Sequence, residues 1–400
     1  MRRLFGFPQA RRYLVGQSVS LFGDMTLWLA MGIWVKTLTG SDGAAGLTFF
    51  FFALPQLFAP LSGVLVDRLP RRPLVVWTNL ATAVLVLALF AVRGPGQVWL
   101  IYLVMFGYGA SYTILGPGGA ALMRMLLPDE LLADANGYLR TVQEGLRLIG
   151  PITGAALFTL FGGGVLALID AASFLVAATA LWSVQVPEAA PPRRDDPWLA
   201  NALAGLRHLR RTPVLRQLTA ASAVALLVIG MIESVAFAVV AQGLNRPVTF
   251  LGTLVAIQGV GAILGGLSAG AAIRRVREGF VVAGGMLAFA AGAALFAVPS
   301  LHIVSVGAVL IGFSVTWLVI GYNTALQHHS PLALQGRVSA GADLLVGTPQ
   351  TVSIAVGAAL VTVVDFRYLL AVIAAVVAGC SAYLLTRPQQ RASAQAMSSR

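Results

Sequence analysis

The sequence predicts an all-α membrane protein of twelve transmembrane helices, arranged as two six-helix halves related by pseudo-symmetry. Its 400 residues are 58% hydrophobic and only 10% charged, whereas about a quarter of the residues of a soluble domain are charged. Apolar runs of about 20 residues, enough to span a bilayer as a helix, recur along nearly the whole chain. The alternating segments of about ten residues that mark a membrane β-barrel are absent, so helices must satisfy the backbone hydrogen bonds.

Glycine, proline and charged residues divide the apolar sequence into its expected spans. They lie at residues 13–37, 44–66, 73–93, 97–123, 137–162 and 165–186, and then at 215–241, 248–273, 279–298, 301–326, 338–363 and 366–386. The predicted domains are an N-terminal half at 1–186, a cytoplasmic linker at 187–213, a C-terminal half at 214–388 and a disordered tail at 389–400. From Trp198, leucines recur at helical spacing with arginines on another face, which predicts an amphipathic helix on the inner leaflet.

The basic residues predict the orientation of the spans. All of the 27 Lys and Arg except Lys36, Arg93, Arg246 and Arg367 fall on or near one side of the predicted spans. Cytoplasmic loops carry the excess of such residues, so both termini are expected in the cytoplasm of a bacterium, with the chain in its inner membrane. The net charge of +12 does not form a basic patch with interleaved aromatics, which argues against nucleic-acid binding.

An internal repeat supports two halves of common ancestry. The segment from Leu61 to Arg72 matches the segment from Leu267 to Glu278 without gaps, and both end a predicted span at the cytoplasmic face. Six-helix repeats related by an axis along the membrane normal are the architecture of a large class of secondary transporters, which bind substrate near the midplane between the halves. The repeat therefore predicts a transporter.

The loop after the second predicted span carries the most specific motif, formed by Gly63, Asp67, Arg68, Arg71 and Arg72. It resembles the G-x-x-x-D-R-x-x-R-R loop signature of the major facilitator superfamily, and this resemblance implies the major facilitator fold with a cytoplasmic gate loop. Gly63 would let two helices approach closely, and Asp67 would face the positive N-terminus of a helix in the other half.

The arginines of this loop are expected to pair with acids such as Asp129 or Asp343. Anchoring of the chain by positive charge at the inner membrane face is the alternative for the arginines, but it does not account for Gly63 and Asp67.

The fifth predicted span contains Gly150, Pro151 and Gly154 in a sequence that resembles the antiporter motif of proton-linked exporters. Such small residues permit close helix packing, and we expect their partner to be the glycine-rich eighth span, with Gly261, Gly265, Gly266 and Gly270. Helix packing alone, without any meaning for antiport, is the alternative.

Further segments, among them Pro128–Leu131, Ile169–Leu175 and Gln335–Ser339, resemble the enterobactin-exporter-like branch of the same superfamily. That branch is itself similar to drug efflux proteins for macrolides and tetracycline and to lysophospholipid transporters. The resemblance implies proton-driven export of amphipathic compounds.

Few ionisable residues occur within the spans, where each costs about 2.5–3.5 kcal/mol on insertion scales and is by default a functional candidate. Asp24 lies near the middle of the first span, on a face with Trp28, and is our candidate for the proton-coupling carboxylate. A structural acid bonded to a neighbouring helix is the alternative. Asp170 is expected to cap the N-terminus of the sixth span.

Arg140, Glu144 and Arg147 follow one another at i, i+4 and i+7, which predicts a ladder of charges on one face of the fifth span. Arg147 would act as counter-ion to Asp24 or bind anionic substrate, unless it only pairs with Glu144. Glu233 in the seventh span occupies nearly the repeat-related position of Asp24 and is the second candidate proton site, the alternatives being a role in closing the outer gate and a simple polar contact at the membrane interface.

Trp28 and Tyr112 could line a cavity for flat lipophilic molecules, although core packing is the simpler interpretation. The four histidines form no metal-ligand set, so no metal site is predicted. The absence of a G-x-x-x-x-G-K-[ST] loop argues against direct use of ATP. No enzyme activity and no cofactor are expected.

The sequence thus predicts a secondary active transporter, a proton-coupled exporter of amphipathic small molecules such as drugs or siderophores, working by alternating access. Its expected partners are its substrate, protons and membrane lipids, and it is expected to act as a monomer. A lysophospholipid or lipid flippase or an uncoupled facilitator is the alternative, and a transporter-like receptor is a third class.

Overall fold

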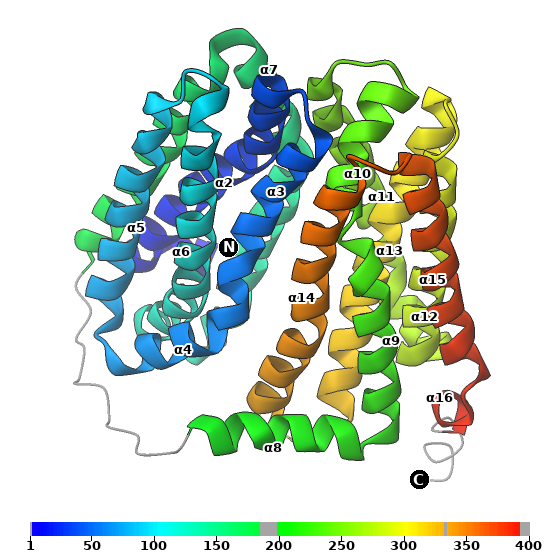
Figure 1. Ribbon diagram of the computed structural model, residues 1–400. Helices are drawn as coiled ribbons and strands as arrows, with labels where there is room; N and C mark the ends of the chain where they lie inside the picture. The colour runs from blue at the N-terminus through cyan, green and yellow to red at the C-terminus, as the bar shows by residue number, and fades with distance from the viewer. Residues whose placement is uncertain (1, 185–197, 332–333, 393–400) are drawn as a thin grey trace. The chain divides into compact units, whose positions relative to one another are not determined.

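The computed structural model describes residues 2–184, 198–331 and 334–392, and every regular element within these ranges is helical (Figure 1). The predicted all-α class is therefore confirmed. The linker residues 187–197 and the tail residues 393–400 lie outside the described ranges.

The chain divides into two compact units, which are Met1–Arg194 with Val248–Ala256, and Asp195–Pro247 with Ile257–Arg400. Unit 1 holds α1 (Arg2–Phe5), α2 (Pro8–Thr39), α3 (Asp42–Ala53), η1 (Leu54–Phe58), α4 (Ala59–Arg68), α5 (Arg71–Leu87), η2 (Ala88–Ala91), η3 (Pro95–Gln97), α6 (Val98–Leu126) and α7 (Asp129–Trp182). The remaining elements are α8 (Trp198–Arg211), α9 (Pro213–Ile229), α10 (Ile232–Ala238), η4 (Val239–Gly243), η5 (Val248–Phe250), α11 (Leu251–Val276), α12 (Glu278–Phe296), α13 (Leu301–His328), α14 (Gln335–Leu360), α15 (Phe366–Thr386) and α16 (Pro388–Ala392).

Within the described residues, ten helices are long and apolar enough to cross a membrane. The longest of them, α7, has 54 residues, which corresponds to about 80 Å at 1.5 Å per residue and exceeds twice the hydrocarbon core of about 30 Å. A shorter apolar helix at Asp42–Phe58 accompanies the ten. Twelve crossings of the membrane remain a prediction.

Gly162 reverses the direction of α7. Its φ of 75° and ψ of 177° are not helical and are readily adopted only by glycine. The parts of α7 before and after Gly162 both pack along α2. The part before the turn runs parallel to α2, and the part after the turn runs antiparallel to it. The contacting pairs are Gly150 with Met25, Gly154 with Thr26, Asp170 with Gly23, and Ala180 with Gly16. The helix therefore contains the fifth and the sixth predicted spans as a hairpin.

The second predicted span, at 44–66, is broken into α3, η1 and α4. Pro55 stands in the first turn of η1 and Pro60 in the first turn of α4. Proline has no N–H to donate and its ring collides with the carbonyl one turn earlier, so the helix tightens and restarts at these positions.

Helix α2 lies at the centre of unit 1. Leu27, Ala30 and Met31 are almost fully buried in a hydrophobic cluster that also contains side chains of α5, α6 and α7. Since α2 is covered on most sides, the polar residues in its middle face other helices of the unit, and this arrangement places Asp24 inside the protein.

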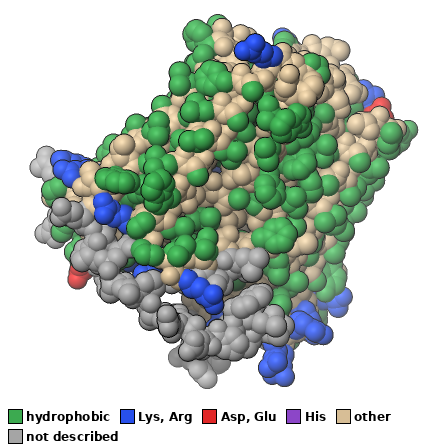
Figure 2. Space-filling view, turned by 60° about the vertical axis from the view of Figure 1, so that its left-hand side comes forward, with side chains coloured by type: hydrophobic (Ala, Val, Ile, Leu, Met, Phe, Trp, Pro, Cys, Tyr) green, Lys and Arg blue, Asp and Glu red, His purple; other side chains and the backbone are tan. Residues whose placement is uncertain are grey.

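The outer faces of the helices are strongly apolar. Leu160 and Val84 are 72% and 70% exposed, and Phe161 and Trp77 are 61% and 63% exposed. Figure 2 shows hydrophobic side chains spread over the face it displays, between other side chains and backbone, with Lys and Arg side chains toward its margins. Such a surface is stable against lipid rather than water, so the protein is a multi-pass membrane protein.

In unit 2, α8 packs on the beginning of α14. Gly205 lies directly against the backbone of Arg337, and Leu206 contacts Gly341. Leu209 is buried while Arg207 and Arg210 are exposed, as expected for an amphipathic helix. Its place on the inner leaflet remains a prediction.

The predicted disordered tail differs from the structure at its beginning. Residues Pro388–Ala392 form α16, and Gln390 is only 4% exposed. The Gln390 side-chain amide donates to Gln217 Oε1 at 3.1 Å, and the Gln217 amide donates to Gln389 Oε1 at 3.0 Å. These paired amides dock the segment on α9, which composition alone does not indicate.

Candidate functional site

Asp24 lies in the middle of α2 and is half-buried. Its Oδ1 accepts a hydrogen bond of 2.5 Å from the Tyr108 hydroxyl of α6. A carboxyl group at this depth of a membrane span is costly unless polar groups face it. The phenol of Tyr108 is such a polar partner. The alternative in which Asp24 is a structural acid bonded to a neighbouring helix requires the same kind of contact.

Asp170 lies beside Asp24, in the part of α7 after the turn, and is fully buried. A Cβ atom added to Gly23 would overlap both Oδ1 of Asp170 and Oγ of Ser173, so the absent side chain of Gly23 provides the room for this carboxyl group. Within the described structure neither carboxylate oxygen of Asp170 has a hydrogen-bond partner. The Ser173 hydroxyl instead donates to the Asp170 carbonyl at 2.7 Å.

The prediction that Asp170 caps a helix is wrong. The turn of α7 occurs at Gly162, eight residues earlier, and Asp170 lies inside the following helix. The cap was expected because Asp170 stands only five residues after the predicted start of the sixth span at residue 165, and Asp is a common capping residue. Asp170 is instead a second buried carboxyl group next to α2.

Tyr108 was not identified from the sequence, where it stands in an apolar run without a distinguishing motif. It is 5% exposed, its ring meets Phe174 edge-on at 5.7 Å between centroids, and it lies 6.1 Å from the ring of Phe52. The neighbouring Gly109 allows α6 to touch the backbone of Phe52. This packing fixes the direction of the hydroxyl toward α2.

The antiporter-like motif packs against α2 immediately after Asp24. A Cβ on Gly150 would lie 2.6 Å from Cβ of Met25, and one on Gly154 would overlap the Thr26 carbonyl oxygen. Pro151 lies inside α7 between these two glycines. The motif thus sets the spacing between α7 and the segment of α2 that carries Asp24.

The predicted partner of this motif, the eighth span, meets it at its beginning, where a Cβ on Gly252 would lie 2.7 Å from the Pro151 carbonyl oxygen, but not at the four glycines that were expected to make the contact. Of these four, Gly261 and Gly265 pack on α13, where a Cβ on Gly261 would overlap the Val309 carbonyl and one on Gly265 would lie 2.7 Å from the Phe313 carbonyl. Small residues let any two helices approach closely, so their spacing cannot identify the partner helix.

The predicted charge ladder is present on the first part of α7. Arg140 lies 2.8 Å from Glu144, and Arg147 lies 4.0 Å from the other carboxylate oxygen of Glu144. The side chains are 64%, 37% and 50% exposed in that order: Arg140, Glu144, Arg147. The carboxylate of Asp24 bonds to Tyr108 rather than to Arg147. Charges so exposed within a span are stable facing water, which favours a polar, water-accessible side for this face.

Trp28 packs against Phe49 of α3 at 4.8 Å between ring centroids and adjoins the buried cluster around α2, which favours the core-packing alternative for this residue. Tyr112 is 51% exposed and lies within electrostatic range of Asp24, Arg140 and Arg147. It therefore remains a candidate for substrate contact.

Glu233, the second candidate proton site, is half-buried in the first turn of α10 in unit 2. The short α10 follows α9 and leads into the π-helical η4, which ends the span at Gly243.

The gate-loop motif lies where α4 ends and α5 begins. Gly63 and Asp67 are in α4, with side chains outside what the structure describes, and Arg68 is its last residue. Arg71 and Arg72 open α5. The interaction predicted for Asp67 therefore stays a prediction.

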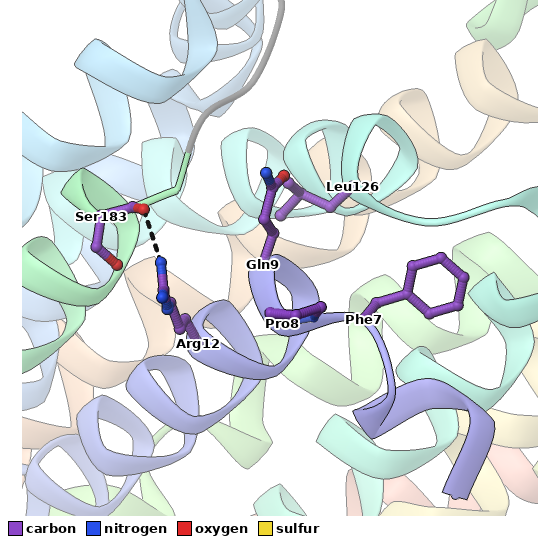
Figure 3. A pocket seen from close by; sticks show the side chains of 6 residues that line it. All are labelled: Phe7, Pro8, Gln9, Arg12, Leu126 and Ser183. Atoms are coloured by element: carbon purple, nitrogen blue, oxygen red, sulfur yellow. Dashed lines mark hydrogen bonds between the residues drawn. The ribbon is translucent and has the colours of Figure 1, made fainter.

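Arg72 donates two hydrogen bonds to backbone carbonyl groups, and the pairing of the loop arginines with acids stays a prediction. Its Nε donates to the Leu181 carbonyl at 3.3 Å and its Nη2 to the Trp182 carbonyl at 2.5 Å. Arg12 donates to the next carbonyl, that of Ser183, at 3.0 Å (Figure 3). The last carbonyls of a helix have no partner within it and carry partial negative charge, so guanidinium groups satisfy them.

Beside the Arg12 bond lies a pocket of about 510 Å³, lined by Phe7, Pro8, Gln9, Arg12, Leu126 and Ser183 (Figure 3). It sits at the end of unit 1 where α2 begins and α6 and α7 end. Asp24 stands sixteen residues after Pro8 on α2, so the pocket lies far from Asp24 along that helix.

A second polar cluster lies at the ends of α12 and α13 in unit 2, where Glu278 pairs with His328. The His208 ring nitrogen bonds to the His329 carbonyl at 2.8 Å. Burial lowers the pKa of His329, and the charges of Arg277 and His328 add to this against the opposing effect of Glu278. Among the described residues no three His, Cys, Asp or Glu side chains form a group that could hold a metal ion.

Comparison with known proteins identifies bacterial efflux proteins as relatives in sequence. The chain is 27% identical to the multidrug efflux pump Tap of Mycolicibacterium fortuitum over 340 residues, which cover 80% of this chain and 82% of Tap. It is also 27% identical to macrolide efflux protein A of Streptococcus pyogenes over 178 residues. That match spans 43% of this chain and 44% of the relative, less than half of its length.

Solved transporter structures share the fold. The nucleoside transporter NupG matches with a TM-score of 0.77 at 13% identity, over 94% of this chain and 98% of that one. An inward-facing bacterial homologue of the iron transporter ferroportin matches with a TM-score of 0.72 at 16% identity, over 95% and 98%. The sequence model of the Major Facilitator Superfamily matches residues 13–348. The chain therefore belongs to the Major Facilitator Superfamily, whose transporters carry small-molecule substrates.

Proposed function

We propose that this protein is a proton-coupled exporter of amphipathic small molecules, working by alternating access in the inner membrane of a bacterium with both termini in the cytoplasm. The observation that carries the proposal is the Asp24 carboxyl group, half-buried in the central helix of unit 1 and bonded to Tyr108. A carboxyl group there can change its protonation as its surroundings change between two conformations, which is the requirement for coupling.

The efflux direction rests on the similarity to Tap and to macrolide efflux protein A. The substrate class rests on the surroundings of Asp24. Tyr112 offers an exposed aromatic face, and Arg140 and Arg147 leave one positive charge in excess over Glu144 on the neighbouring face of α7. Aromatic faces bind flat lipophilic groups by dispersion and cation–π contact.

Efflux from bacterial cells that lack their own pumps tests the proposal. The substrates are lipophilic cations, macrolides and siderophore-like acids, and the cells express the wild type or Asp24→Asn, each with and without an uncoupler. Extrusion by the wild type is expected, and both the uncoupler and Asp24→Asn are expected to abolish it.

Asp365→Asn is the matched control. This variant makes the same change from Asp to Asn outside the candidate site. Asp365 is exposed and caps α15 by accepting a hydrogen bond from the Arg367 N–H at 2.8 Å. Asparagine caps a helix equally well, so this variant is expected to transport normally. Extrusion that persists in Asp24→Asn and under the uncoupler would favour the facilitator or lipid flippase, and binding without flux would favour the receptor.

A further inference from the structure

The further inference concerns Asp170, Tyr108 and Asp24, which lie together inside unit 1. The Tyr108 hydroxyl bonds to Asp24, and the Tyr108 ring meets Phe174, one turn after Asp170 on α7, at 5.7 Å between centroids. Asp170 comes from α7, Tyr108 from α6 and Asp24 from α2. Three helices thus bring two carboxyl groups to one phenol.

The hydroxyl protons that this cluster can donate decide the protonation state of Asp170. Tyr108 has one hydroxyl proton, and it goes to Asp24 at 2.5 Å. Ser173 has one hydroxyl proton, and it goes to the Asp170 carbonyl at 2.7 Å. In this arrangement neither hydroxyl bonds to the side chain of Asp170, whose two oxygens are buried without a hydrogen-bond partner.

A fully buried carboxylate without any donor is strongly unfavourable, and such a group takes up a proton instead. A protonated Asp170 becomes a donor, and the oxygen of Tyr108 retains lone pairs that can accept from it. Such a donation would join the three groups into one chain, from Asp170 to Tyr108 and from Tyr108 to Asp24.

We propose that Asp170, Tyr108 and Asp24 form a proton relay in which Asp170 stores the proton that Asp24 exchanges with the transport cavity, an inference that rests on the proposed proton coupling. In one concerted step the Tyr108 O–H proton passes to Asp24 and the Asp170 proton passes to Tyr108. Two O–H bonds break and two form, one proton moves in net terms from Asp170 to Asp24, and the negative charge moves from Asp24 to Asp170.

The phenol makes both end states favourable. Before the transfer Tyr108 donates to the carboxylate of Asp24, and afterwards it donates to the carboxylate of Asp170. The other ionisable groups near the relay are Tyr112, which lies within range of Asp24, and Arg140 and Arg147, which lie within range of Tyr112. Asp24 is half-buried and Asp170 fully buried, so exchange with water takes place at Asp24.

Infrared difference spectroscopy of the purified full-length protein in detergent tests the storage site without any transport. The wild type at neutral pH is expected to show the carbonyl band of a protonated carboxylic acid, and the band is expected to be lost in Asp170→Asn and kept in Tyr108→Phe. A wild type without this band, or a band that survives in Asp170→Asn, would overturn the storage role.

Transport in vesicles with an imposed pH gradient tests the relay itself. Tyr108→Phe removes the transferring hydroxyl and is expected to slow gradient-driven transport by about a hundredfold, the typical contribution of a positioned proton donor. Tyr102→Phe is the matched control on the same helix, because the Tyr102 hydroxyl only donates to the Ala44 carbonyl at 2.9 Å, and it is expected to transport at the wild-type rate.

The two experiments separate the relay from the proposed function. If the wild type shows no dependence on the pH gradient, the proton-coupled function fails, while the infrared band still reports on Asp170. If the wild type is coupled and Tyr108→Phe transports with an unchanged rate and pH dependence, the relay fails alone. Thermal unfolding of each variant establishes that it is folded, and Tyr108→Phe carries the test should Asp170→Asn not fold.

Discussion

Gly154 of α7 lies directly against Thr26 of α2, so closely that a methyl group at residue 154 would overlap the Thr26 carbonyl oxygen. This contact stands two residues after Asp24 and on the same side as the contact between Gly150 and Met25. The small residues of the antiporter-like motif therefore hold the first part of α7 against the helix that carries the candidate proton site.

Gly154→Ala is expected to destabilise the protein by about 1–3 kcal/mol, because the added Cβ is fixed by the backbone of α7 and the carbonyl oxygen that it meets belongs to the backbone of α2. Gly145→Ala on the same helix is the control, since a Cβ there would meet no atom within 4 Å, and alanine is favoured over glycine by about 1 kcal/mol in a helix. Thermal unfolding in one detergent measures both. Equal midpoints for the two variants would show that the contact is not tight.

Arg72→Ala is expected to lower the free energy of unfolding by about 1–2 kcal/mol. The change removes two hydrogen bonds to the last carbonyls of α7 and a positive charge at the negative end of that helix. Arg93→Ala removes an exposed arginine from the same unit and is expected to change the unfolding midpoint little. A loss in Arg72→Ala that matches the loss in Arg93→Ala would contradict this role.

Lys36 and Asp42 form an ion pair of 2.8 Å between the end of α2 and the start of α3, with side chains 14% and 7% exposed. Asp42→Ala is expected to lower the free energy of unfolding by about 3 kcal/mol, because it leaves the ammonium of Lys36 largely buried without its ion-pair partner Asp42. The double variant Lys36→Met with Asp42→Ala is expected to recover much of this loss. Additive losses in a double-mutant cycle would show that the two groups are not coupled.

His329, which follows α13 in unit 2, is expected to make the stability of the protein depend on pH. Its pKa is lowered in the folded protein from an ordinary value of 6.5, with burial as the largest cause. As the pH falls through 6.5, the unfolded chain therefore binds a proton before the folded protein does, and stability is lost until the pH passes the folded pKa. Above 6.5 this contribution is fully present.

Thermal unfolding at pH about 7.5 and about 5.5 measures the effect. The wild type is expected to lose more stability over this interval than His329→Gln, which has no proton to bind. His302→Gln, at an exposed histidine of α13, is expected to behave as the wild type. A loss of the same size in His329→Gln would assign the dependence to other groups.

The apolar runs of the sequence determined the helical class and the approximate place of the spans, because a bilayer requires long apolar helices whatever their neighbours are. The ladder of Arg140, Glu144 and Arg147 also followed from the sequence, since residues three and four apart on a helix are always neighbours. The candidacy of Asp24 needed only its charge and its depth in a span.

The tertiary structure alone decided which helices meet. The spacing of Gly150 and Gly154 indicated a close contact but did not show that α2 is their partner, and the sequence placed a turn near Gly162 without showing that Asp170 packs on Gly23 of α2. Tyr108 gained its position from Phe52, Phe174 and Gly109, all distant from Asp24 in the chain. Local periodicity shows which side chains share a face, whereas the partner of that face is chosen by the packing of all the other helices.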